Sequence, residues 1–310
     1  MKVLVTGGAG FIGSNIVDAL LDAGHSVAVV DDLSTGKQSN VDTRAHFYLA
    51  DIRDQAALTR VFDKEQPEIV LHQGAKANVR ESMDKPVLYA DVNILGSINL
   101  LEQARRTGVK KFVYASTGGA SYGEPQYLPV REDHPINPLD PYGTSKHNVE
   151  HYIFLYHYNY KLPYNILRYP NVYGPRQDPL GEAGVIAIFA GKMLKGERPA
   201  LNGKGDKERD FVYVGDVARA NLLAMTSEHN TIYNIGWGVG TNINTIFEKL
   251  REIIGFAGEP IYGPDKPGEV YKIYLDATKA RNELGWAPTL SLEAGLRKTV
   301  DYFRVHITGG

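Results

Sequence analysis

The chain begins with Met1-Lys-Val-Leu-Val-Thr-Gly-Gly-Ala-Gly-Phe-Ile-Gly13, an apolar run followed by closely spaced glycines, and this motif predicts the fold class. Its apolar run is typical of a buried parallel strand, and the amphipathic residues 11–23 that follow the glycines predict a helix. Gly7, Gly10 and Gly13 recur at three-residue spacing, and Gly8 with the last two also fits G-x-G-x-x-G. Such glycines allow a tight turn, close approach of backbone to a pyrophosphate, and close packing of helix on strand. The helix N-terminus would direct free N–H groups and its positive dipole end at the phosphates.

A second predicted strand, residues 26–30, ends in the acidic pair Asp31-Asp32. Asp31 lies 18 residues past Gly13 (31 − 13), close to the spacing of roughly 20 expected for a carboxylate that holds an adenosine ribose. A glycine-rich turn alone is often purely structural, but the flanking strand, helix and acid favour dinucleotide binding. No arginine directly follows the acidic pair, which favours NAD over NADP.

The composition is that of an ordinary globular protein. The 310 residues are 43% hydrophobic and 23% charged with a net charge of −2, which gives no global case for binding nucleic acid or an anionic membrane. The absence of cysteine excludes disulfides and thiolate chemistry, and it fits a reducing compartment. No apolar run reaches the roughly 18 residues of a membrane span, and none near Met1 is long enough for a secretory signal. We expect a soluble, cytoplasmic protein.

Strand and helix patterns alternate through the first half of the chain. This order predicts an α/β fold with a doubly wound parallel (Rossmann) sheet. The expected strands are 3–5, 26–30, 46–49, 69–72, 111–115 and 164–168, and the helices between them include 55–64, 87–106 and 142–160. Beyond about residue 170, glycine- and proline-punctuated pieces surround helical stretches at 186–195, 214–225, 245–254 and 292–302. We expect an NAD-binding domain at 1–168 and a smaller α/β substrate-binding domain at 169–310, with some later segments returning to the first domain.

Tyr142-Gly-Thr-Ser-Lys146 is the second informative motif. Asp140-Pro141 before it predicts a helix N-terminus, and the i, i+4 spacing places phenol and ammonium on one helix face. The lysine and the helix N-terminus both favour phenolate, so we expect a lowered tyrosine pKa and a general base. Tyr262 and Lys266 share the spacing, but Gly263-Pro264 breaks that segment. The position of Tyr142 in a helix that follows a parallel strand therefore decides between the two pairs.

Hydroxyl groups cluster where the strand 111–115 ends, in Ser116-Thr-Gly-Gly-Ala-Ser-Tyr-Gly123. At the carboxyl end of a sheet strand they could bind a substrate oxygen and pass its proton to Tyr142. The alternative is a polar turn, which serine, threonine and glycine form anyway.

Together these motifs resemble the extended short-chain dehydrogenase/reductase family, and within it the nucleotide-sugar epimerases that act on UDP-glucose and UDP-galactose. The resemblance covers nearly the whole chain. Besides the glycine motif and the Tyr142/Lys146 pair, it rests on Asp31-Asp-Leu-Ser-Thr-Gly36, Asp51-Ile52, Asn93, Arg168-Tyr-Pro-Asn-Val-Tyr-Gly-Pro175 and Arg209-Asp-Phe-Val-Tyr-Val214.

The resemblance implies an isomerase that uses tightly bound NAD. Tyr142 would take the proton of the sugar 4-hydroxyl while C4 is oxidised, and the 4-keto sugar would rotate and be reduced on its other face. Lys146 would hold the nicotinamide ribose, and the nicotinamide charge would help to lower the tyrosine pKa. By analogy the family also implies a homodimer, in which two such helices of each subunit form a bundle. The segments 87–106 and 142–160 are rich in apolar residues, which this dimer would bury, and burial within one chain is the alternative.

Site residues carried over by the resemblance fall into three groups. The catalytic residues would be Tyr142, Lys146 and Thr117. The substrate contacts would be Thr117, Tyr142, Asn171, Arg209, Lys266 and Glu269, and no metal is implied. The cofactor contacts would be Gly7, Gly10, Phe11, Ile12, Gly13, Asp31, Asp32, Leu33, Ser34, Thr35, Gly36, Asp51, Ile52, Gln73, Gly74, Ala75, Asn93, Ser116, Tyr142, Lys146 and Tyr169.

Three positions depart from the family pattern. Many relatives carry serine or threonine where this chain has Gly118, so Thr117, Ser116 or a water must act instead, and we favour Thr117. Lys266-Pro-Gly-Glu269 stands where relatives often have arginine and aspartate for the diphosphate and the uridine ribose. A lysine keeps the positive charge but cannot bind a phosphate through two parallel N–H groups, as arginine does. His72-Gln-Gly-Ala75 differs slightly at the nicotinamide side but keeps small residues.

Several other functions compete with this interpretation. Epimerases of N-acetylated or uronic acid UDP-sugars differ at groups that few residues contact, with Ile273 a pocket candidate by family position. Dehydratases and decarboxylases need an acid where this chain has Gly118, Gly119 and Ala120. His147-Asn-Val-Glu-His151 matches the inverted zinc-protease pattern, but no third ligand is indicated. A non-catalytic NAD sensor is the remaining alternative.

Overall fold

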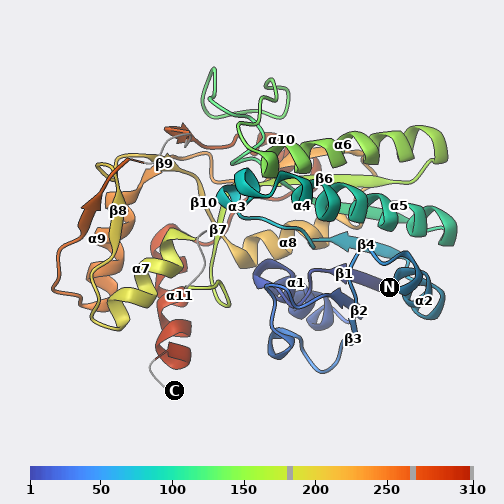
Figure 1. Cartoon of the computed structure of the whole chain (residues 1–310), viewed down its shortest axis with the longest axis horizontal. Coiled ribbons are helices and arrows are strands. Elements are labelled where there is room, and N and C mark those ends of the chain that lie inside the picture. Colours follow the sequence, from blue (N-terminus) through green and yellow to red (C-terminus); the bar gives the residue numbers. More distant parts are fainter. Residues whose placement is uncertain (180–183, 266–269, 308–310) are drawn as a thin grey trace.

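The chain forms two lobes, of which the larger is built round a parallel sheet and the smaller lies at its edge (Figure 1). This computed structural model describes residues 1–179, 184–265 and 270–307. The predicted substrate contacts Lys266 and Glu269 lie outside the described residues.

Seven parallel strands make up the central sheet, in the order β11-β6-β5-β4-β1-β2-β3. They are β1 (Lys2–Thr6), β2 (Ser26–Asp31), β3 (His46–Leu49), β4 (Ile69–His72), β5 (Lys111–Thr117), β6 (Tyr164–Tyr169) and β11 (Thr231–Asn234). From β1 the order runs one way to β2 and β3 and the other way to β4 and β5, so a topological switch point lies between β1 and β4. Ligands bind at the carboxyl ends of strands at such a point. The predicted fold class is confirmed.

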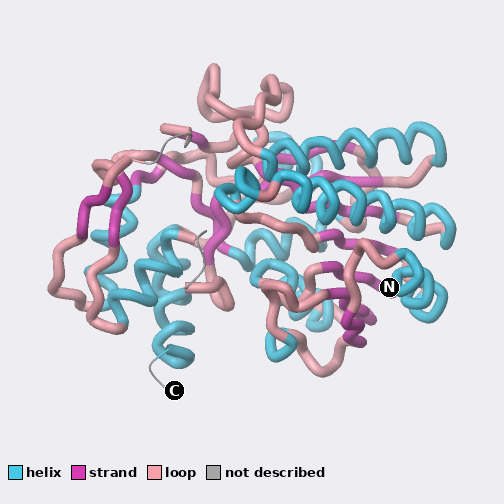
Figure 2. Tube along the Cα trace, in the orientation of Figure 1, coloured by secondary structure: helices cyan, strands magenta, loops and turns pink. Residues whose placement is uncertain are grey.

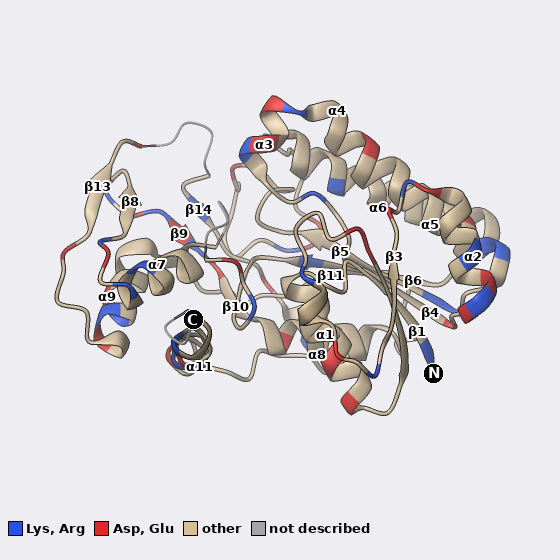
Figure 3. Cartoon of the chain, turned by 60° about the horizontal axis from the view of Figure 1, so that its bottom comes forward, with Lys and Arg blue, Asp and Glu red and all other residues tan. Residues whose placement is uncertain are grey.

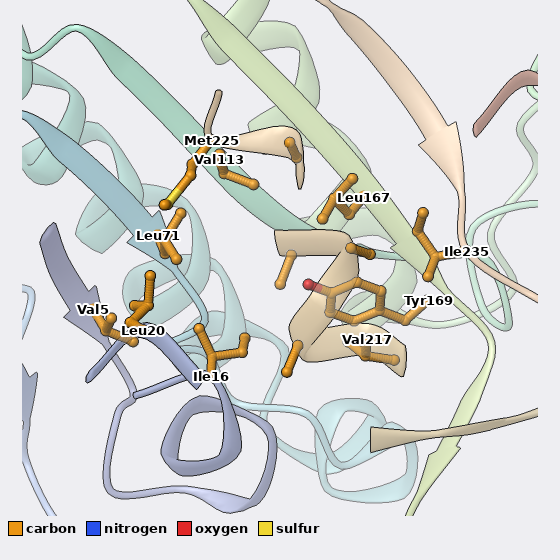
Figure 4. Close-up of a cluster of buried hydrophobic side chains, with 14 of the residues drawn as sticks. Val5, Ile16, Leu20, Leu71, Val113, Leu167, Tyr169, Val217, Met225 and Ile235 are labelled. Carbon is orange, nitrogen blue, oxygen red and sulfur yellow. The ribbon is translucent and has the colours of Figure 1, made fainter. Parts of the chain in front are cut away.

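Helices cover both faces of the sheet (Figure 2). One face packs on α1 (Phe11–Asp22) and α8 (Val214–Ala224), and the other on α2 (Gln55–Glu65), α5 (Gly96–Thr107) and α6 (Pro141–Tyr160). Side chains alternate along each strand: Val5 joins the core under α1, which Figure 4 shows, while Leu4 joins the opposite core. Both faces are therefore buried, as the continuous apolar strands predict.

The predicted helix 87–106 is present but is not uniform. It consists of α4 (Pro86–Tyr89), a π-helical segment η2 (Ala90–Leu95) and α5, and a further short helix, α3 (Val79–Asp84), precedes it. The hydrophobic pattern does not distinguish i→i+5 from i→i+4 hydrogen bonds over six residues, so the sequence analysis missed the π turn. It also missed β11, the short seventh strand that pairs with β6.

Three helices form the smaller lobe: α7 (Val185–Leu194), α9 (Ile243–Ile254) and α11 (Leu292–Ile307), which share one apolar core. The two-stranded sheet of β7 (Asn171–Tyr173) and β10 (Phe211–Tyr213) lies between this lobe and the large sheet. A second pair, β8 (Ala200–Asn202) and β13 (Ile261–Gly263), lies on the outer side of the smaller lobe. A three-stranded sheet contains β12 (Thr241–Asn242), β9 (Glu208–Arg209) and β14 (Lys272–Ile273). The remaining short helices are η1 (Gln38–Asn40) and α10 (Thr278–Leu284).

Acidic and basic residues alternate along the chain in both lobes (Figure 3). An anion-binding surface on this chain must therefore be local, as the net charge of −2 already indicated. None of the helices in the described part of the chain is both long enough and apolar enough to span a membrane.

Candidate active site

The glycine loop between β1 and α1 lies at the switch point of the sheet. Gly7 has φ +67°, in the left-handed region, and its N–H donates to Val30 O at 2.9 Å. A Cβ on Gly7 would lie 2.7 Å from Gly74 Cα, and one on Gly13 would lie 2.1 Å from Gly7 O. Three backbone segments therefore meet here at distances that only glycine allows.

The N-terminus of α1 fits a pyrophosphate. The first hydrogen bond of the helix runs from Ser14 N to Gly10 O at 3.0 Å, so the helix does not use the N–H groups of Phe11, Ile12 and Gly13. The N-cap residue Gly10 has no side chain to cap them. Together with the positive dipole end, these groups are suited to bind the phosphates of a dinucleotide.

Asp31 ends β2 beside this loop. Its Oδ2 accepts from Ala9 N at 3.0 Å and its Oδ1 from Leu33 N at 2.8 Å. Burial raises the pKa of Asp31, and these two backbone bonds oppose the rise. The turn that contains Asp32, Leu33, Ser34, Thr35 and Gly36 is fixed by the bond from Ser34 N to Asp32 Oδ1. The predicted ribose contact is thus joined to the glycine loop.

Asp51 and Ile52 lie past β3 on the same side. Arg53 donates to the Asp51 carboxylate through Nε and through a terminal nitrogen, the latter at 2.6 Å from Oδ2. Ile52 is buried in the core beneath α5. The protein itself therefore fixes the position of both residues.

The loop after β4 holds the predicted nicotinamide contacts Gln73, Gly74 and Ala75. Gln73 Nε2 donates to Asn221 Oδ1 at 3.1 Å, and Asn221 Nδ2 donates to Tyr169 Oη at 2.8 Å. The Tyr169 hydroxyl also lies 3.4 Å from Gln73 Oε1. Three side chains, from the loop after β4, from β6 and from α8, thus close a ring of hydrogen bonds at the carboxyl edge of the sheet.

Asn93, in the π segment η2, is only 1% exposed. Its Oδ1 accepts from Lys76 N at 2.8 Å, and its Nδ2 donates to Lys76 O at 3.0 Å and to Ser145 Oγ at 2.8 Å. Both amide hydrogens are therefore used within the protein. Asn93 joins the loop after β4 to helix α6, and it supports the cofactor side of the site from beneath.

Helix α6 carries Tyr142 and Lys146. It begins at Pro141, where the Asp140 carboxylate caps it by accepting from Gly143 N at 2.7 Å. The Thr117 hydroxyl at the end of β5 accepts from Ala120 N at 3.2 Å and is hydrogen-bonded to the Tyr142 phenol. Lys146 is buried, with its Nζ 4.3 Å from the centroid of the Tyr114 ring. Three of the predicted catalytic groups are thus gathered between β5 and α6.

The expected lowering of the Tyr142 pKa was wrong for the protein without a cofactor. Burial raises the pKa of Tyr142 to about 12, although the Thr117 hydrogen bond lowers it. Burial also lowers the pKa of Lys146 to about 7. Loss of hydration penalises phenolate and ammonium alike, and this effect outweighs the helix N-terminus and the neighbouring lysine. A lowered tyrosine pKa therefore needs a further positive charge at the site.

The structure distinguishes the candidate hydroxyls near Gly118. A Cβ on Gly118 would lie 2.4 Å from Leu275 Cδ1, so Leu275 fills the space that a side chain would need. Ser116 Oγ donates to Glu150 Oε1 at 2.6 Å and is buried. Thr117 is the hydroxyl that reaches Tyr142.

Asn171 and Arg209 lie together where the two lobes join. Asn171 begins β7, where it pairs with Phe211 of β10, and its N–H donates to Asp210 O at 3.0 Å. Arg209 ends β9, and its guanidinium is directed by bonds to Glu208 O at 2.9 Å and Tyr271 O at 3.3 Å. Both side chains are partly exposed, and β7 pairs with β10 directly after Arg209 and Asp210.

Asp210, which follows Arg209, lies beside the candidate site and was not predicted from the sequence. It is fully buried, and its carboxylate accepts from Trp237 N at 2.9 Å, Gly238 N at 3.1 Å and Leu275 N at 3.1 Å. Burial raises its pKa to about 6, although the three bonds lower it. Asp210 thereby holds the segment after β11 and the residue Leu275 against the site.

Asp210→Asn should change how stability depends on pH. Because the folded-state pKa of about 6 lies above the ordinary 3.8, folding favours the protonated acid. This contribution is complete below pH 3.8 and is lost as the pH rises through about 6. Asp210→Asn lacks this contribution. The amount by which its unfolding free energy, measured with urea, falls below that of the wild type should therefore decrease by about 2 to 3 kcal/mol between pH 4 and pH 7. A deficit that is constant over this range would contradict the raised pKa.

The histidines of the zinc-protease-like pattern are arranged differently from a metal centre. The Glu150 carboxylate points into the core, where Arg168 binds it at 2.6 Å. His147 Nδ1 lies 3.1 Å from Glu150 Oε2, and its Nε2 lies 3.1 Å from His151 Nε2. Within residues 1–179, 184–265 and 270–307, no three histidine or acidic side chains are grouped so that they could hold a metal ion.

Known proteins resemble this chain over nearly its full length. Residues 3–236 match the pattern of the NAD dependent epimerase/dehydratase family. The UDP-glucose 4-epimerase of Mycolicibacterium smegmatis is 41% identical over 98% of this chain and 99% of its own. The structure of UDP-glucose 4-epimerase from Thermotoga maritima, with UDP-glucose, is 50% identical with a TM-score of 0.98, covering 99% of this chain and 100% of that chain. The enzyme from Thermus thermophilus, with NAD, is 46% identical with a TM-score of 0.94, covering 98% and 99%.

Proposed function

Because the chain belongs to the NAD dependent epimerase/dehydratase family, we propose that it interconverts UDP-glucose and UDP-galactose by inverting C4 of the sugar. The observation that carries this function is the match, at 50% identity and TM-score 0.98, to a UDP-glucose 4-epimerase with UDP-glucose. The chain is therefore an isomerase, and NAD is its cofactor.

The cofactor would lie along the switch point. The glycine loop and the free N–H groups of α1 would hold its phosphates, Asp31 its adenosine ribose, and Lys146 its nicotinamide ribose. When bound, NAD supplies a reversible two-electron oxidation at C4 of the sugar. The residues from Gly7 to Gly13 fit this group, because the helix leaves the N–H groups of Phe11, Ile12 and Gly13 unused and the N-cap Gly10 has no side chain to cover them.

Tyr142 would act as the general base and acid. It takes the proton of the 4-hydroxyl when C4 is oxidised, and it returns that proton to the 4-oxygen when C4 is reduced on its other face. Thr117, hydrogen-bonded to the phenol, would hold this oxygen in reach. In the chain alone the pKa of Tyr142 is raised to about 12. A positive nicotinamide ring, held through its ribose by Lys146, would supply the further charge that favours phenolate.

The substrate diphosphate would lie at the junction of the lobes. Arg209 offers a planar guanidinium that fits phosphate oxygens, and Asn171 offers an amide beside it. We further propose that Lys266 and Glu269 contact the diphosphate and the uridine ribose. The division into a cofactor domain, 1–168, and a mainly sugar-nucleotide domain, 169–310, follows from these roles.

The absence of an acid near C4 favours epimerisation over elimination. Gly118, Gly119 and Ala120 occupy the positions where dehydratases and decarboxylases carry acids. At Gly118 the contact with Leu275 also leaves no room for a larger residue. A position without a side chain cannot transfer the proton that loss of water needs.

A homodimer through α5 and α6 is supported by the exposed face of α6. Tyr152, Phe154, Leu155 and Tyr158 are exposed there, and Tyr158 reaches 66% exposure. An apolar patch of this kind commonly marks a protein–protein contact. Sedimentation should give about twice the 34.2 kDa of one chain, and a monomer at micromolar concentration would contradict the dimer.

We place the enzyme in the cytoplasm, in keeping with a chain that has no cysteine.

Proton NMR of UDP-galactose with the purified protein tests the function. Signals of UDP-glucose should grow to an equilibrium mixture, in samples with and without added NAD. No conversion, with NAD still bound to the protein, would exclude the glucose/galactose pair. The N-acetylated and uronic acid sugar nucleotides would then be tested in the same assay, and failure of all three would leave a non-catalytic NAD-binding protein.

Thr117→Val should lower kcat for UDP-galactose by about 10- to 100-fold. This is the effect expected from the loss of one hydrogen bond to a charged group, here the phenolate of Tyr142. Valine keeps the shape of threonine but cannot hydrogen-bond the Tyr142 phenol. Thr117→Ser, which keeps the hydroxyl, is the matched control and should retain most activity. Equal activity of the valine and serine variants would show that another group holds the phenol.

A further inference from the structure

Glu150 lies on α6, one helical turn after Lys146 and two turns after Tyr142. It is only 4% exposed, and the reaction as described above gives it no role. A buried carboxylate is costly unless it is paired and fully hydrogen-bonded. It lies on the same helix as Tyr142 and Lys146, so its charge can act on both of them.

Four donors hold the Glu150 carboxylate. Arg168 on β6 donates from Nε to Oε1 at 2.9 Å and from a terminal nitrogen to Oε2 at 2.6 Å. Ser116 Oγ donates to Oε1 at 2.6 Å, and His147 Nδ1 lies 3.1 Å from Oε2. Burial alone would raise the pKa of Glu150, but Arg168 and the other donors lower it to about 2. The carboxylate is therefore ionised and has one fixed orientation.

Arg168 is itself fixed. Its other terminal nitrogen donates to Tyr122 Oη at 2.9 Å, and the Tyr122 hydroxyl donates to Asn234 Oδ1 at 2.8 Å. Asn234 belongs to β11, so the network reaches from α6 across β6 to the edge of the sheet. The carboxylate beneath Lys146 is thus anchored to the rigid part of the fold.

Lys146 depends on this carboxylate for its charge. Its Nζ lies over the Tyr114 ring of β5, and the buried, neutral His72 of β4 lies near it. Burial lowers the pKa of Lys146 to about 7, and the Glu150 carboxylate opposes the decrease. Tyr142, on the same helix, is neutral until it loses its proton. Glu150 is therefore the negative charge that this buried group offers to the lysine.

The charges of the group also fit the reaction. Arg168 neutralises Glu150, and Lys146 remains as one buried positive charge. Removal of Glu150 would leave Arg168 and Lys146 as two buried cations without a carboxylate, and Lys146 would lose its proton more readily. A neutral Lys146 can neither favour the phenolate of Tyr142 by its charge nor bind a ribose hydroxyl as strongly.

We propose that Glu150 is a positioning residue of the active site, whose carboxylate, anchored by Arg168 and Ser116 one helical turn after Lys146, supplies the buried negative charge that keeps Lys146 cationic. This role rests on the proposed function, since it serves the pair Tyr142/Lys146. It differs from a purely structural ion pair between α6 and β6, because it predicts an effect on the titration of the enzyme.

The test is the pH profile of kcat for UDP-galactose in the NAD-loaded enzyme. With Glu150→Gln, the alkaline limb should move by about one pH unit or more toward lower pH, the effect of losing one nearby opposite charge. Glu102→Gln is the matched control, because Glu102 also pairs with an arginine, Arg105, but lies on α5 away from the site. Its alkaline limb should coincide with that of the wild type.

Glu150→Gln leaves Arg168 buried without its partner, which is strongly destabilising. If that variant does not fold, Glu150→Gln/Arg168→Met removes both charges and should fold, and its alkaline limb should also move to lower pH. A folded, NAD-loaded variant with the wild-type profile would overturn the role of Glu150 and leave the function intact. A wild-type enzyme that does not convert UDP-galactose would instead overturn the proposed function before any variant is compared.

Discussion

Tyr142→Phe should lower kcat for UDP-galactose by about 10³- to 10⁴-fold, in the upper part of the range for loss of a general acid–base group. Phenylalanine keeps the ring in its place on α6 but removes the oxygen that carries the proton to and from O4. The proton NMR assay at high enzyme concentration measures the residual rate. The NAD content of the purified variant should equal that of the wild type, because the phosphate and adenosine contacts are unchanged.

Tyr160→Phe provides the control for this substitution. Tyr160 is the exposed last residue of the same helix, so its replacement makes the same chemical change away from the site. We expect wild-type kcat for this control. If Tyr142→Phe retained more than about a tenth of the wild-type kcat, well outside the usual effect of losing a general base, Tyr142 would not be the proton acceptor.

Gly13→Ala should abolish NAD binding. The new Cβ would lie 2.1 Å from Gly7 O and 2.9 Å from Gly8 Cα, and both atoms belong to backbone that cannot move aside without opening the turn. The loop must then separate from α1, which removes the free N–H groups from their place beside the phosphates. The protein should purify without NAD, should not be activated by added NAD, and should unfold at a lower temperature than the wild type.

Gly263→Ala is the matched control for this prediction. Among the described residues, a Cβ at Gly263 would come close to Leu201 O alone, at 3.6 Å, which is ordinary contact. This variant should bind NAD as the wild type does. A Gly13→Ala protein that retained its NAD would show that the loop does not hold the phosphates as described.

The parts of the fold that follow from the sequence are those coded by local pattern. The glycine motif, the apolar strands and the capped start of α6 each depend on a few neighbouring residues. β11 was missed because its four residues, Thr231–Asn234, carry too little apolar pattern to stand out and become a strand only by pairing with β6. Asp210 was missed for a similar reason, since its three donors come from residues distant in the chain.

The hydroxyl beside Tyr142 shows the same limit within the site. The sequence left Thr117, Ser116 and a water as candidates, because spacing does not fix the direction of a side chain at a turn. A contact from a distant residue bears on one of them, because Glu150 binds the Ser116 hydroxyl and so favours Thr117 over Ser116. The lowered pKa expected for Tyr142 was wrong because burial, which depends on the whole fold, outweighs its local neighbours.

The fate of deuterium at C4 of the sugar tests whether Tyr142 handles only the proton on O4 while the hydrogen on carbon is transferred without exchange. UDP-galactose labelled with deuterium at C4 is incubated with the enzyme in ordinary water, and the UDP-glucose formed is analysed by mass spectrometry and NMR. Tyr142 handles only the proton on O4, so the account predicts that the product keeps its deuterium at C4. Replacement of that deuterium by solvent hydrogen would contradict it, because a base would then have removed the hydrogen from carbon.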